Sequence, residues 1–460
     1  SSCSNLGIMY VDGEGVEADS AHAKKIFEDS CHRGGAEGCA HLGSMFLQGI
    51  GVDRAPEKAA ALYQDSCDDG YVSACTYLAR LHQRGEGVEK NELRAIGLYD
   101  RACNDGDGEA CGELASMYAR GEGVSQDWAR AATSYQTACQ RGLSNACTEL
   151  GLIFQQGLGV DKDPAKAAEL LSVACQNGSA AGCHWSAAGL RGEEPEKAIA
   201  SYKTACEGGM ARSCTELGLM VASGQGLAPN PQQALALFNH GCEKGDPLGC
   251  VRLGSMYEAG VAVERDVTKA RTLFHSNCQK GSAEACYALG SSLVGEVPGR
   301  TVELYGVACQ KGLLSACSRL GDLVLGAVGV AKNVDTSVSL YTKACTGGIG
   351  EACRKLGVLY TVGKELEGNP AVGAGWYKRA CDGGDLAGCE ALAGYLSETD
   401  RASSLRLYSE LCQRQMGLSC ERLGEYYSQG LSVEKDRKKG RDFFEQACQY
   451  GQSSACGRKK

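Results

Sequence analysis

The stretch that decides the fold is CHRGGAEGCAHLGSMFLQGIGVDRAPEKAAALYQDSCDDGYVSAC, residues 31–75. It contains a C-x7-C pair, a helix-compatible run, a G-x-G-V loop, a second run and the next C-x7-C pair. The same order recurs along the chain, where successive pairs begin 36 residues apart nine times and 31 residues apart three times. A fixed period of about 20–50 residues predicts a solenoid or another repeat array.

Each repeat contains the pattern of two helices. The first follows the second cysteine of a pair, and the residues three, four and seven places on, such as Leu42, Gly43 and Phe46, share one helical face. The small residue on this face lets a neighbouring helix approach closely. Glycines of the G-x-G-V loop allow the positive φ angles of a tight reversal. The second helix then runs toward the next cysteine, as over residues 56–67.

An aromatic column marks the second helix. Four residues before the first cysteine of each pair, twelve of the thirteen repeats carry phenylalanine or tyrosine. We expect this column to fill a repeated slot in the core rather than to bind a ligand. Its members are Phe27, Tyr63, Tyr99, Tyr135, Leu171, Tyr202, Phe238, Phe274, Tyr305, Tyr341, Tyr377, Tyr408 and Phe444.

The composition narrows the class of protein. Of 460 residues, 63 are glycine, 27 are cysteine and only 8 are proline, which excludes collagen and proline-rich disorder. Hydrophobic residues make up 43% of the chain, enough for a sizeable core. No apolar run approaches the roughly 18 residues of a membrane span, so we expect no membrane insertion. The net charge of −9 is opposite to the basic footprint of nucleic-acid binding, so we expect no nucleic-acid partner.

The C-x7-C spacing favours disulfide bonds over metal ligands. Residues eight apart on one continuous helix lie about 12 Å apart, whereas a disulfide needs Cα atoms within about 7 Å. The chain therefore has to turn, and a glycine three residues after the first cysteine stops the helix in every pair but one, where Gln415 stands. Closing so short a loop contributes roughly 2–3 kcal/mol in the chain-entropy model. The zinc alternative needs four converging ligands, and no C-x2-C or paired histidine supplies them.

Paired cysteines in this number predict an oxidising compartment. Cys3 fits the spacing of a second cysteine whose partner would lie eight residues upstream. We therefore expect the natural chain to be longer at its N-terminus, with a signal sequence removed or outside this chain. The expected disulfides join Cys31 with Cys39, Cys67 with Cys75, Cys103 with Cys111, Cys139 with Cys147, Cys175 with Cys183, Cys206 with Cys214, Cys242 with Cys250, Cys278 with Cys286, Cys309 with Cys317, Cys345 with Cys353, Cys381 with Cys389, Cys412 with Cys420 and Cys448 with Cys456.

These motifs resemble Sel1-like repeats, relatives of the tetratricopeptide repeat, over the whole chain. The pattern is A-C-x2-L-G-x2-Y/F-x2-G-x-G-V followed by K-A-x3-Y/F-x2-A-C-x2-G, and residues 95–103, 110–124 and 146–160 carry it well. The disulfide form is similar to cysteine-rich secreted proteins of Helicobacter and to a cytochrome c oxidase assembly factor of the mitochondrial intermembrane space. The resemblance implies an α/α solenoid that binds other proteins. It also implies, as an alternative, the penicillin binding or weak β-lactamase activity described for cysteine-rich relatives.

We expect an all-α protein, one continuous right-handed superhelix of about 13 disulfide-stapled repeats over residues 1–460. Three repeats depart from the pattern: after Cys183, Cys286 and Cys389 the loop between the helices is five residues shorter and lacks G-x-G-V. From Cys103 onward the order long, long, short recurs. It indicates either a duplicated block of three repeats or a curvature modulated at that period.

Catalytic motifs are scarce. The seven histidines share no common position in the repeat, and H-E-x-x-H, G-x-S-x-G and G-x4-G-K-[ST] do not occur. One S-x-x-K, from Ser432 to Lys435, lies in a loop slot without an accompanying K-T-G, and we interpret it as chance. We expect no catalytic residue, no metal and no cofactor. The β-lactam alternative depends on the resemblance alone.

The better candidate for function is a surface on the first helices. Residues two, five and nine places after the second cysteine point away from the core face, and in related superhelices the first helices line the concave groove. At the place two residues on, acidic side chains precede basic ones along the chain, and two aromatic residues interrupt a polar face. A solvated face whose charge drifts is the alternative. The candidate partner-binding residues are Tyr77, Glu113, Glu149, Trp185, Glu216, Arg252, Arg319, Lys355 and Arg422.

We therefore expect a non-enzymatic binding or scaffold protein, periplasmic or extracellular, with the mitochondrial intermembrane space as the alternative location. A protein, peptide or peptidoglycan-like partner would dock along the groove, and the disulfides would keep the superhelix rigid, so that little ordering cost opposes binding. A structural subunit of a membrane, envelope or intermembrane-space assembly is the remaining alternative.

Overall fold

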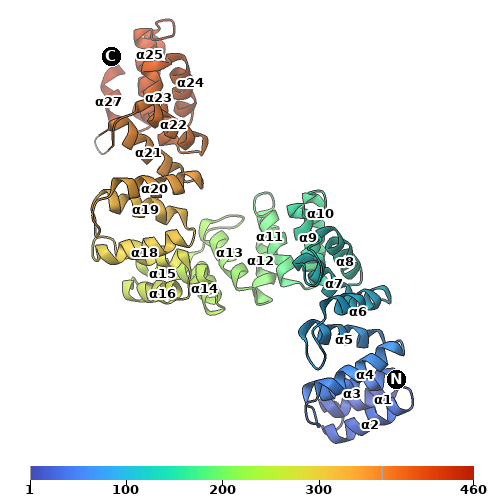
Figure 1. Ribbon diagram of the computed structural model, residues 1–460. Helices are drawn as coiled ribbons and strands as arrows, with labels where there is room; N and C mark the ends of the chain where they lie inside the picture. The colour runs from blue at the N-terminus through green and yellow to red at the C-terminus, as the bar shows by residue number, and fades with distance from the viewer. Residues whose placement is uncertain (1, 364–365, 460) are drawn as a thin grey trace. The chain divides into compact units, whose positions relative to one another are not determined.

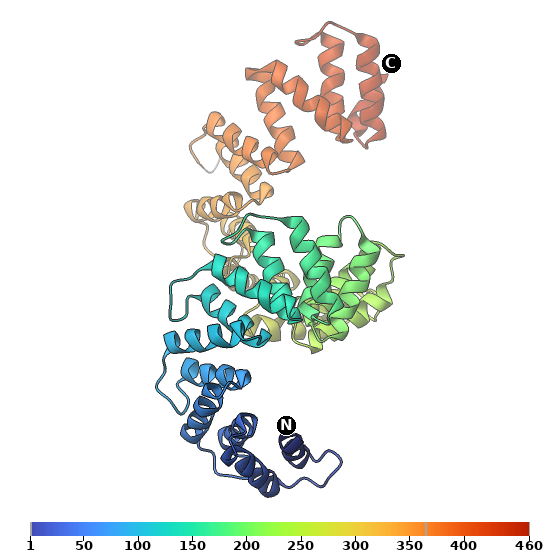
Figure 2. The same ribbon diagram turned by 90° about the vertical axis from the view of Figure 1, so that its right-hand side faces the viewer.

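The structure is a computed structural model that describes residues 2–363 and 366–459, except the side chains of Ser2, Cys3 and Lys459. The expected disulfide role of Cys3 thus lies outside the described residues. Across the described ranges the chain is helical and contains no strand, as the sequence predicts. Contacts between helices divide it into two compact units, Ser1–Lys244 and Gly245–Lys460. Within each unit, successive helices pack as antiparallel neighbours (Figure 1 and Figure 2).

In the first unit, each odd-numbered helix packs on the even-numbered helix that follows it, and the pair packs on the next pair. We call the odd-numbered members first helices and the even-numbered members second helices. Their bounds are α1 Ser2–Asp12, α2 Ser20–His32, α3 Ala36–Gln48, α4 Pro56–Asp68, α5 Val72–Arg84, α6 Glu92–Asn104, α7 Gly108–Arg120, α8 Trp128–Gln140, α9 Ser144–Gln156, α10 Pro164–Gln176, α11 Ala180–Leu190, α12 Pro195–Glu207, α13 Ala211–Ser223 and α14 Pro231–Glu243.

The second unit repeats this arrangement and closes on a short helix and a 3-10 turn. Its bounds are α15 Pro247–Ala259, α16 Val267–Gln279, α17 Ala283–Ser292, α18 Pro298–Gln310, α19 Leu314–Leu325, α20 Val334–Thr346, α21 Gly350–Val362, α22 Pro370–Asp382, α23 Leu386–Thr399, α24 Arg401–Gln413, α25 Gly417–Gln429, α26 Arg437–Gln449, α27 Ser453–Cys456 and η1 Gly457–Lys459.

Local sequence explains where the second helices begin. Most are capped by an aspartate or asparagine that accepts a backbone N–H of the first turn; the Asp127 carboxylate, for example, accepts from Arg130 N. The helices α4, α12 and α18 lack a capping side chain and instead begin with proline, whose φ suits the first helical position. In the short repeat of α23, the G-x-G-V loop is replaced by Asp400 alone, which caps α24.

The G-x-G-V loop uses its two glycines for different purposes. Gly85 ends α5 with a φ of +71°, the left-handed conformation that terminates many helices. Gly87 also has a φ of +71°, and a Cβ there would lie 2.2 Å from the carbonyl carbon of Pro56. The second glycine therefore lets the loop rest directly on the start of the preceding repeat's second helix.

The core confirms the expected aromatic column. Every member of the column is at most 8% exposed. The small residue four places after the second cysteine lies against the ring from the following helix: a Cβ on Gly357 would lie 2.3 Å from Tyr377. Glycine or alanine at that place sets the distance between the two helices of a repeat.

The disulfides join neighbouring repeats as expected. Twelve of the thirteen predicted pairs are bonded with Cα–Cα distances of 4.3–4.9 Å. Cys242 and Cys250 are disulfide-bonded as well.

The position of the second cysteine differs from the prediction that the first helix follows it. The first helices start three residues before this cysteine, so both cysteines of a pair lie within helices and the turn between them is short. The turn ends as soon as the glycine has reversed the chain, so the next helix begins before the second cysteine. The sulfur of this cysteine therefore projects from the first turn of that helix. Examples of second cysteines inside first helices are Cys39 in α3, Cys75 in α5, Cys111 in α7, Cys317 in α19, Cys353 in α21 and Cys420 in α25.

The same six cysteines are buried rather than displayed on a surface, since each is at most 6% exposed: Cys39, Cys75, Cys111, Cys317, Cys353 and Cys420. Their bonded partners are, in the same order, Cys31, Cys67, Cys103, Cys309, Cys345 and Cys412. A buried and oxidised sulfur offers neither a thiolate nor a contact surface to a partner. The role of these residues is therefore structural, and they belong to the core and not to a binding site.

Candidate functional site

Two hollows on the first helices of the first unit meet in one trough. The smaller has a volume of about 490 Å³ and is lined from α3, α4, α5 and α7, and the larger has about 630 Å³ and is lined from α5, α7, α8 and α9. They share Arg80 and Glu113. Nine residues that lie two, five or nine places after the second cysteine in four successive repeats line this trough. We define the first-unit groove by these residues together with Trp128 and Tyr135; they are Ser44, Gln48, Tyr77, Arg80, Arg84, Glu113, Ser116, Arg120 and Glu149.

Tyrosines of the aromatic column reach the floor of this groove with their hydroxyl groups. Tyr63 and Tyr135 line the two hollows, and Tyr63 Oη lies 2.9 Å from Ser44 Oγ. Burial raises the pKa of Tyr63 to about 12. Burial and then the charge of Glu149 raise the pKa of Tyr135. The floor is therefore made of neutral hydroxyl groups at physiological pH.

Most charges in the groove are already paired. Arg80 Nη2 lies 3.1 Å from Glu109 Oε2 and 3.4 Å from Glu113 Oε1. Arg120 Nε lies 2.6 Å from Glu122 Oε1. Arg84 and Glu149 differ: across the described residues neither side chain makes a hydrogen bond or an ion pair. Desolvation by the surrounding protein raises the pKa of Glu149.

Two of the basic candidate residues, Arg319 and Lys355, lie next to carboxylates of the same protein. Lys355 Nζ lies 2.8 Å from both Asp322 Oδ2 and Glu351 Oε1. Arg319 faces the same two carboxylates at 3.7 and 3.9 Å. Both basic side chains are therefore paired with carboxylates, and a partner-binding role for Arg319 and Lys355 stays a prediction. The acidic partners could have been found in the sequence, because Asp322 lies five places after its cysteine, on the same helical face.

The remaining candidates lie in varied surroundings. Glu216 is paired with Arg191 at 3.0 Å and with Arg212 at 2.9 Å, which leaves its side chain 13% exposed. Arg252 is exposed. Trp185 is 38% exposed and packs edge-on against His184, outside the hollows found among the described residues. A binding role for Trp185 stays a prediction.

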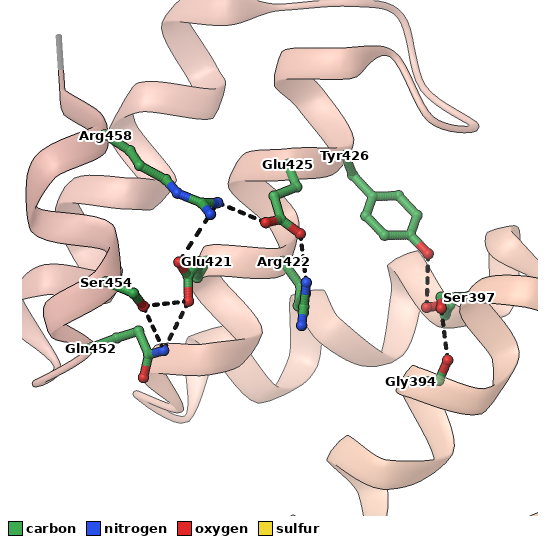
Figure 3. A network of polar contacts seen from close by, with 10 residues as sticks. Gly394, Ser397, Glu421, Arg422, Glu425, Tyr426, Gln452, Ser454 and Arg458 are labelled. Carbon is green, nitrogen blue, oxygen red and sulfur yellow. Dashed lines mark hydrogen bonds and ion pairs between the residues drawn. The ribbon is translucent and has the colours of Figure 1, made fainter.

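A smaller hollow of about 400 Å³ is lined from α23, α24 and α25 of the second unit. Arg422 and Glu425 line it and pair at 2.8 Å. Arg458 pairs with Glu425 at 2.6 Å and with Glu421 at 3.6 Å. Gln452 and Ser454 donate to Glu421 as well, so its carboxylate is surrounded by donors (Figure 3). The network ties α25 to the last turns of the chain and leaves these carboxylates engaged.

Among the described residues, neither the candidate metal ligands nor the S-x-x-K serine has a geometry suited to metal binding or catalysis. Cys206, Cys214 and His240 come within 4.8 Å of one another, but the two sulfurs are joined in a disulfide and offer no thiolate. Ser432 has a φ of +58° because it stands at the second glycine place of its loop. No hydrogen bond joins it to Lys435 in this described loop. Ser432 is therefore not activated by Lys435 in the way that the β-lactam alternative requires.

The family follows from comparison with sequence models. The Sel1 repeat model matches residues 1–34, 36–71, 72–107, 108–143, 144–179, 211–246, 247–282, 314–349, 350–385 and 417–451. The chain belongs to the Sel1 repeat family. Three stretches that the model does not match, 180–210, 283–313 and 386–416, coincide with the three short repeats, in which the loop is reduced. The resemblance inferred from the cysteine and glycine spacing is confirmed.

Solved structures agree on the fold. A protective antigen present in uropathogenic Escherichia coli strains is 24% identical, with a TM-score of 0.55 over 95% of this chain and 89% of that one. A Sel1 repeat protein from Oxalobacter formigenes is 21% identical, with a TM-score of 0.50 over 74% of this chain and 92% of that one. No curated protein matches the chain.

Membership of the Sel1 repeat family indicates the general kind of function. Sel1 repeat proteins typically mediate protein–protein interaction and are generally non-enzymatic scaffolds. The disulfides indicate an oxidising, exported location. Within the described ranges, every helix is too short or too polar to cross a bilayer.

Proposed function

We propose that this Sel1 repeat protein binds a protein partner without catalysing a reaction, and that it holds an extended segment of that partner in the first-unit groove. The observation that carries the proposal is the continuity of the groove. Four successive first helices, α3, α5, α7 and α9, contribute residues to one trough; of the places two, five and nine after the second cysteine, α5 and α7 contribute all three, α3 contributes two and α9 contributes one. An extended peptide has the length to contact several repeats at once.

Rigidity supports this function. The first-unit groove is built on helices whose junctions are closed by disulfides, such as those of Cys67 with Cys75 and of Cys103 with Cys111. Since these junctions are fixed before the partner arrives, binding costs little conformational entropy. The disulfides also support a periplasmic or extracellular partner rather than a cytosolic one.

The test uses Tyr77, whose ring lies 5.3 Å from that of Tyr63 at the groove floor. The partner is first isolated by affinity capture from the native oxidising compartment, and its affinity is then measured with purified proteins. We expect Tyr77→Ala to weaken binding about tenfold or more, as loss of an aromatic anchor does. The matched control is Tyr450→Ala, an exposed tyrosine outside the hollows, which leaves affinity unchanged. Equal affinity of the wild type and Tyr77→Ala rejects the groove.

A further inference from the structure

The larger hollow of the first-unit groove contains a carboxylate that the described chain leaves unneutralised. Glu149 lines this hollow on α9 and has no hydrogen bond or ion pair among the described residues. The two arginines that line the same hollow, Arg80 and Arg120, are each paired with glutamates of their own. The hollow therefore presents net negative charge to whatever enters it.

Two aromatic rings line the same hollow as this carboxylate. Tyr135 and Trp128 line the hollow from α8, and the charge of Glu149 acts on the Tyr135 hydroxyl. Trp128 occupies the first position of its helix, and the other second helices of the described chain start there with a non-aromatic residue, often proline. The indole is thus a feature of this repeat and not of the repeat pattern. Indole and phenol faces attract cations, and their attraction grows where water is partly excluded.

A carboxylate and aromatic faces that line one hollow favour an organic cation. One unpaired carboxylate is a poor donor set for a divalent metal, which takes six or more oxygen ligands in the case of calcium. A lysine or arginine side chain instead combines a charged head with an apolar stem, and it can pair with a carboxylate while its stem packs on a ring. The volume of about 630 Å³ leaves room for such a side chain.

We infer that the hollow receives a lysine or arginine side chain from an extended segment of the partner, with Glu149 as its counter-ion and Trp128 and Tyr135 as its walls. The inference rests on the proposed function, because it names the chemistry of the segment that lies in the groove. Specificity for a basic residue follows, since an acidic residue at this place would face Glu149 without a free cation to offset it.

The probe is a capped glycine pentapeptide with one central lysine, compared with its norleucine and glutamate counterparts. The full-length protein, labelled with fluorotryptophan, gives one fluorine resonance for each of its 3 tryptophans, and Trp128→Phe assigns the resonance of interest. We expect the lysine peptide to shift this resonance and to bind about fivefold tighter than the norleucine peptide. In Glu149→Gln the preference should fall below about twofold. Glu169→Gln, the same change on the exposed face of α10, should keep it.

The outcomes separate the two proposals. Equal binding of the lysine and norleucine peptides, or no shift of the Trp128 resonance with either, overturns the cation pocket. A preference that survives Glu149→Gln overturns it as well. If the pocket fails while Tyr77→Ala still weakens the native partner, the groove stands and only the basic anchor is wrong. If the lysine preference depends on Glu149 while Tyr77→Ala leaves partner affinity unchanged, the pocket stands and the groove assignment fails.

Discussion

At the scale of single residues, each repeat depends on a close contact between a small residue and an aromatic ring. The glycine or alanine four places after the second cysteine lies against the ring that precedes the next cysteine by four places. In the repeat of α21 and α22 the approach is so close that a Cβ on Gly357 would lie 2.3 Å from Tyr377. Close-packed interiors accommodate even one extra methyl group only by shifting their neighbours.

Substitution of this glycine tests the contact. We expect Gly357→Ala to lower the free energy of unfolding by about 1–3 kcal/mol, because the strain of overpacking exceeds the gain in helix propensity. Urea unfolding followed by circular dichroism measures the change. Gly375→Ala on α22, where no atom lies within 4 Å of the added Cβ, is the control and should be neutral or stabilising. A stable Gly357→Ala protein would show that the helices are not held at this distance by the ring.

A second residue prediction concerns Gln415. It has a φ of +64°, in the place where the other disulfide turns carry glycine. A non-glycine residue in this conformation costs about 1–2 kcal/mol. Glycine removes this cost, but it loses more backbone entropy on folding, which offsets part of the gain. Gln415→Gly should therefore raise the free energy of unfolding by about 0.5–1 kcal/mol. A lower urea midpoint in the variant would contradict the assigned backbone conformation.

The aromatic column also predicts a loss of stability at alkaline pH. Burial raises the pKa values of Tyr63 and Tyr408 to about 12, whereas an unfolded tyrosine titrates near 10. Because the folded state favours the neutral phenol, this stability is complete below about pH 10 and is lost as the pH rises toward 12. Urea midpoints should fall between about pH 9.5 and 11, and Tyr63→Phe should flatten the decline. Midpoints that stay constant to about pH 11 would rule the burial out.

At the scale of helices, the disulfides act on junctions rather than on the interior of a repeat. Each seen bond joins the last turn of a second helix to the first turn of the following helix. The sequence predicted this pairing because a helix cannot continue through eight residues and still bring two sulfurs together. It did not predict that the next helix starts three residues before the cysteine, because capping residues there vary from Gly35 to Asp107 and Met210.

Removal of one bond tests its local role. We expect the double variant Cys139→Ala, Cys147→Ala to lose about 2–3 kcal/mol of stability while keeping its helix content, since only the chain entropy of one short loop changes. Urea unfolding with and without reductant gives the comparison. Reductant should lower the urea midpoint of the wild type by more than that of the variant, because the wild type has one more bond to lose. An unchanged urea midpoint in the variant would show that the junction is fixed by packing alone.

At the scale of the molecule, the sequence predicted the repeat fold and the side of the first helices on which the candidate residues lie, but not how the charges on that side are paired. Helical periodicity alone places Tyr77, Arg84 and Glu113 on one side. Ion pairing depends on side chains from neighbouring repeats and from other places of the same helix, as with Lys355 and Asp322. A single column of residues does not contain that information, and the unpaired state of Glu149 emerged only from the structure.

The most direct test of the central claim, that the first helices hold the partner, is site-specific photo-crosslinking. Benzoylphenylalanine replaces either Arg84, which lines the first-unit groove, or Leu93, which is 66% exposed on α6 outside it. The full-length protein is irradiated with its native partner, and crosslinked bands are identified by mass spectrometry. We predict a specific crosslink from position 84 and none from position 93. A crosslink from position 93 without one from position 84 would contradict the account.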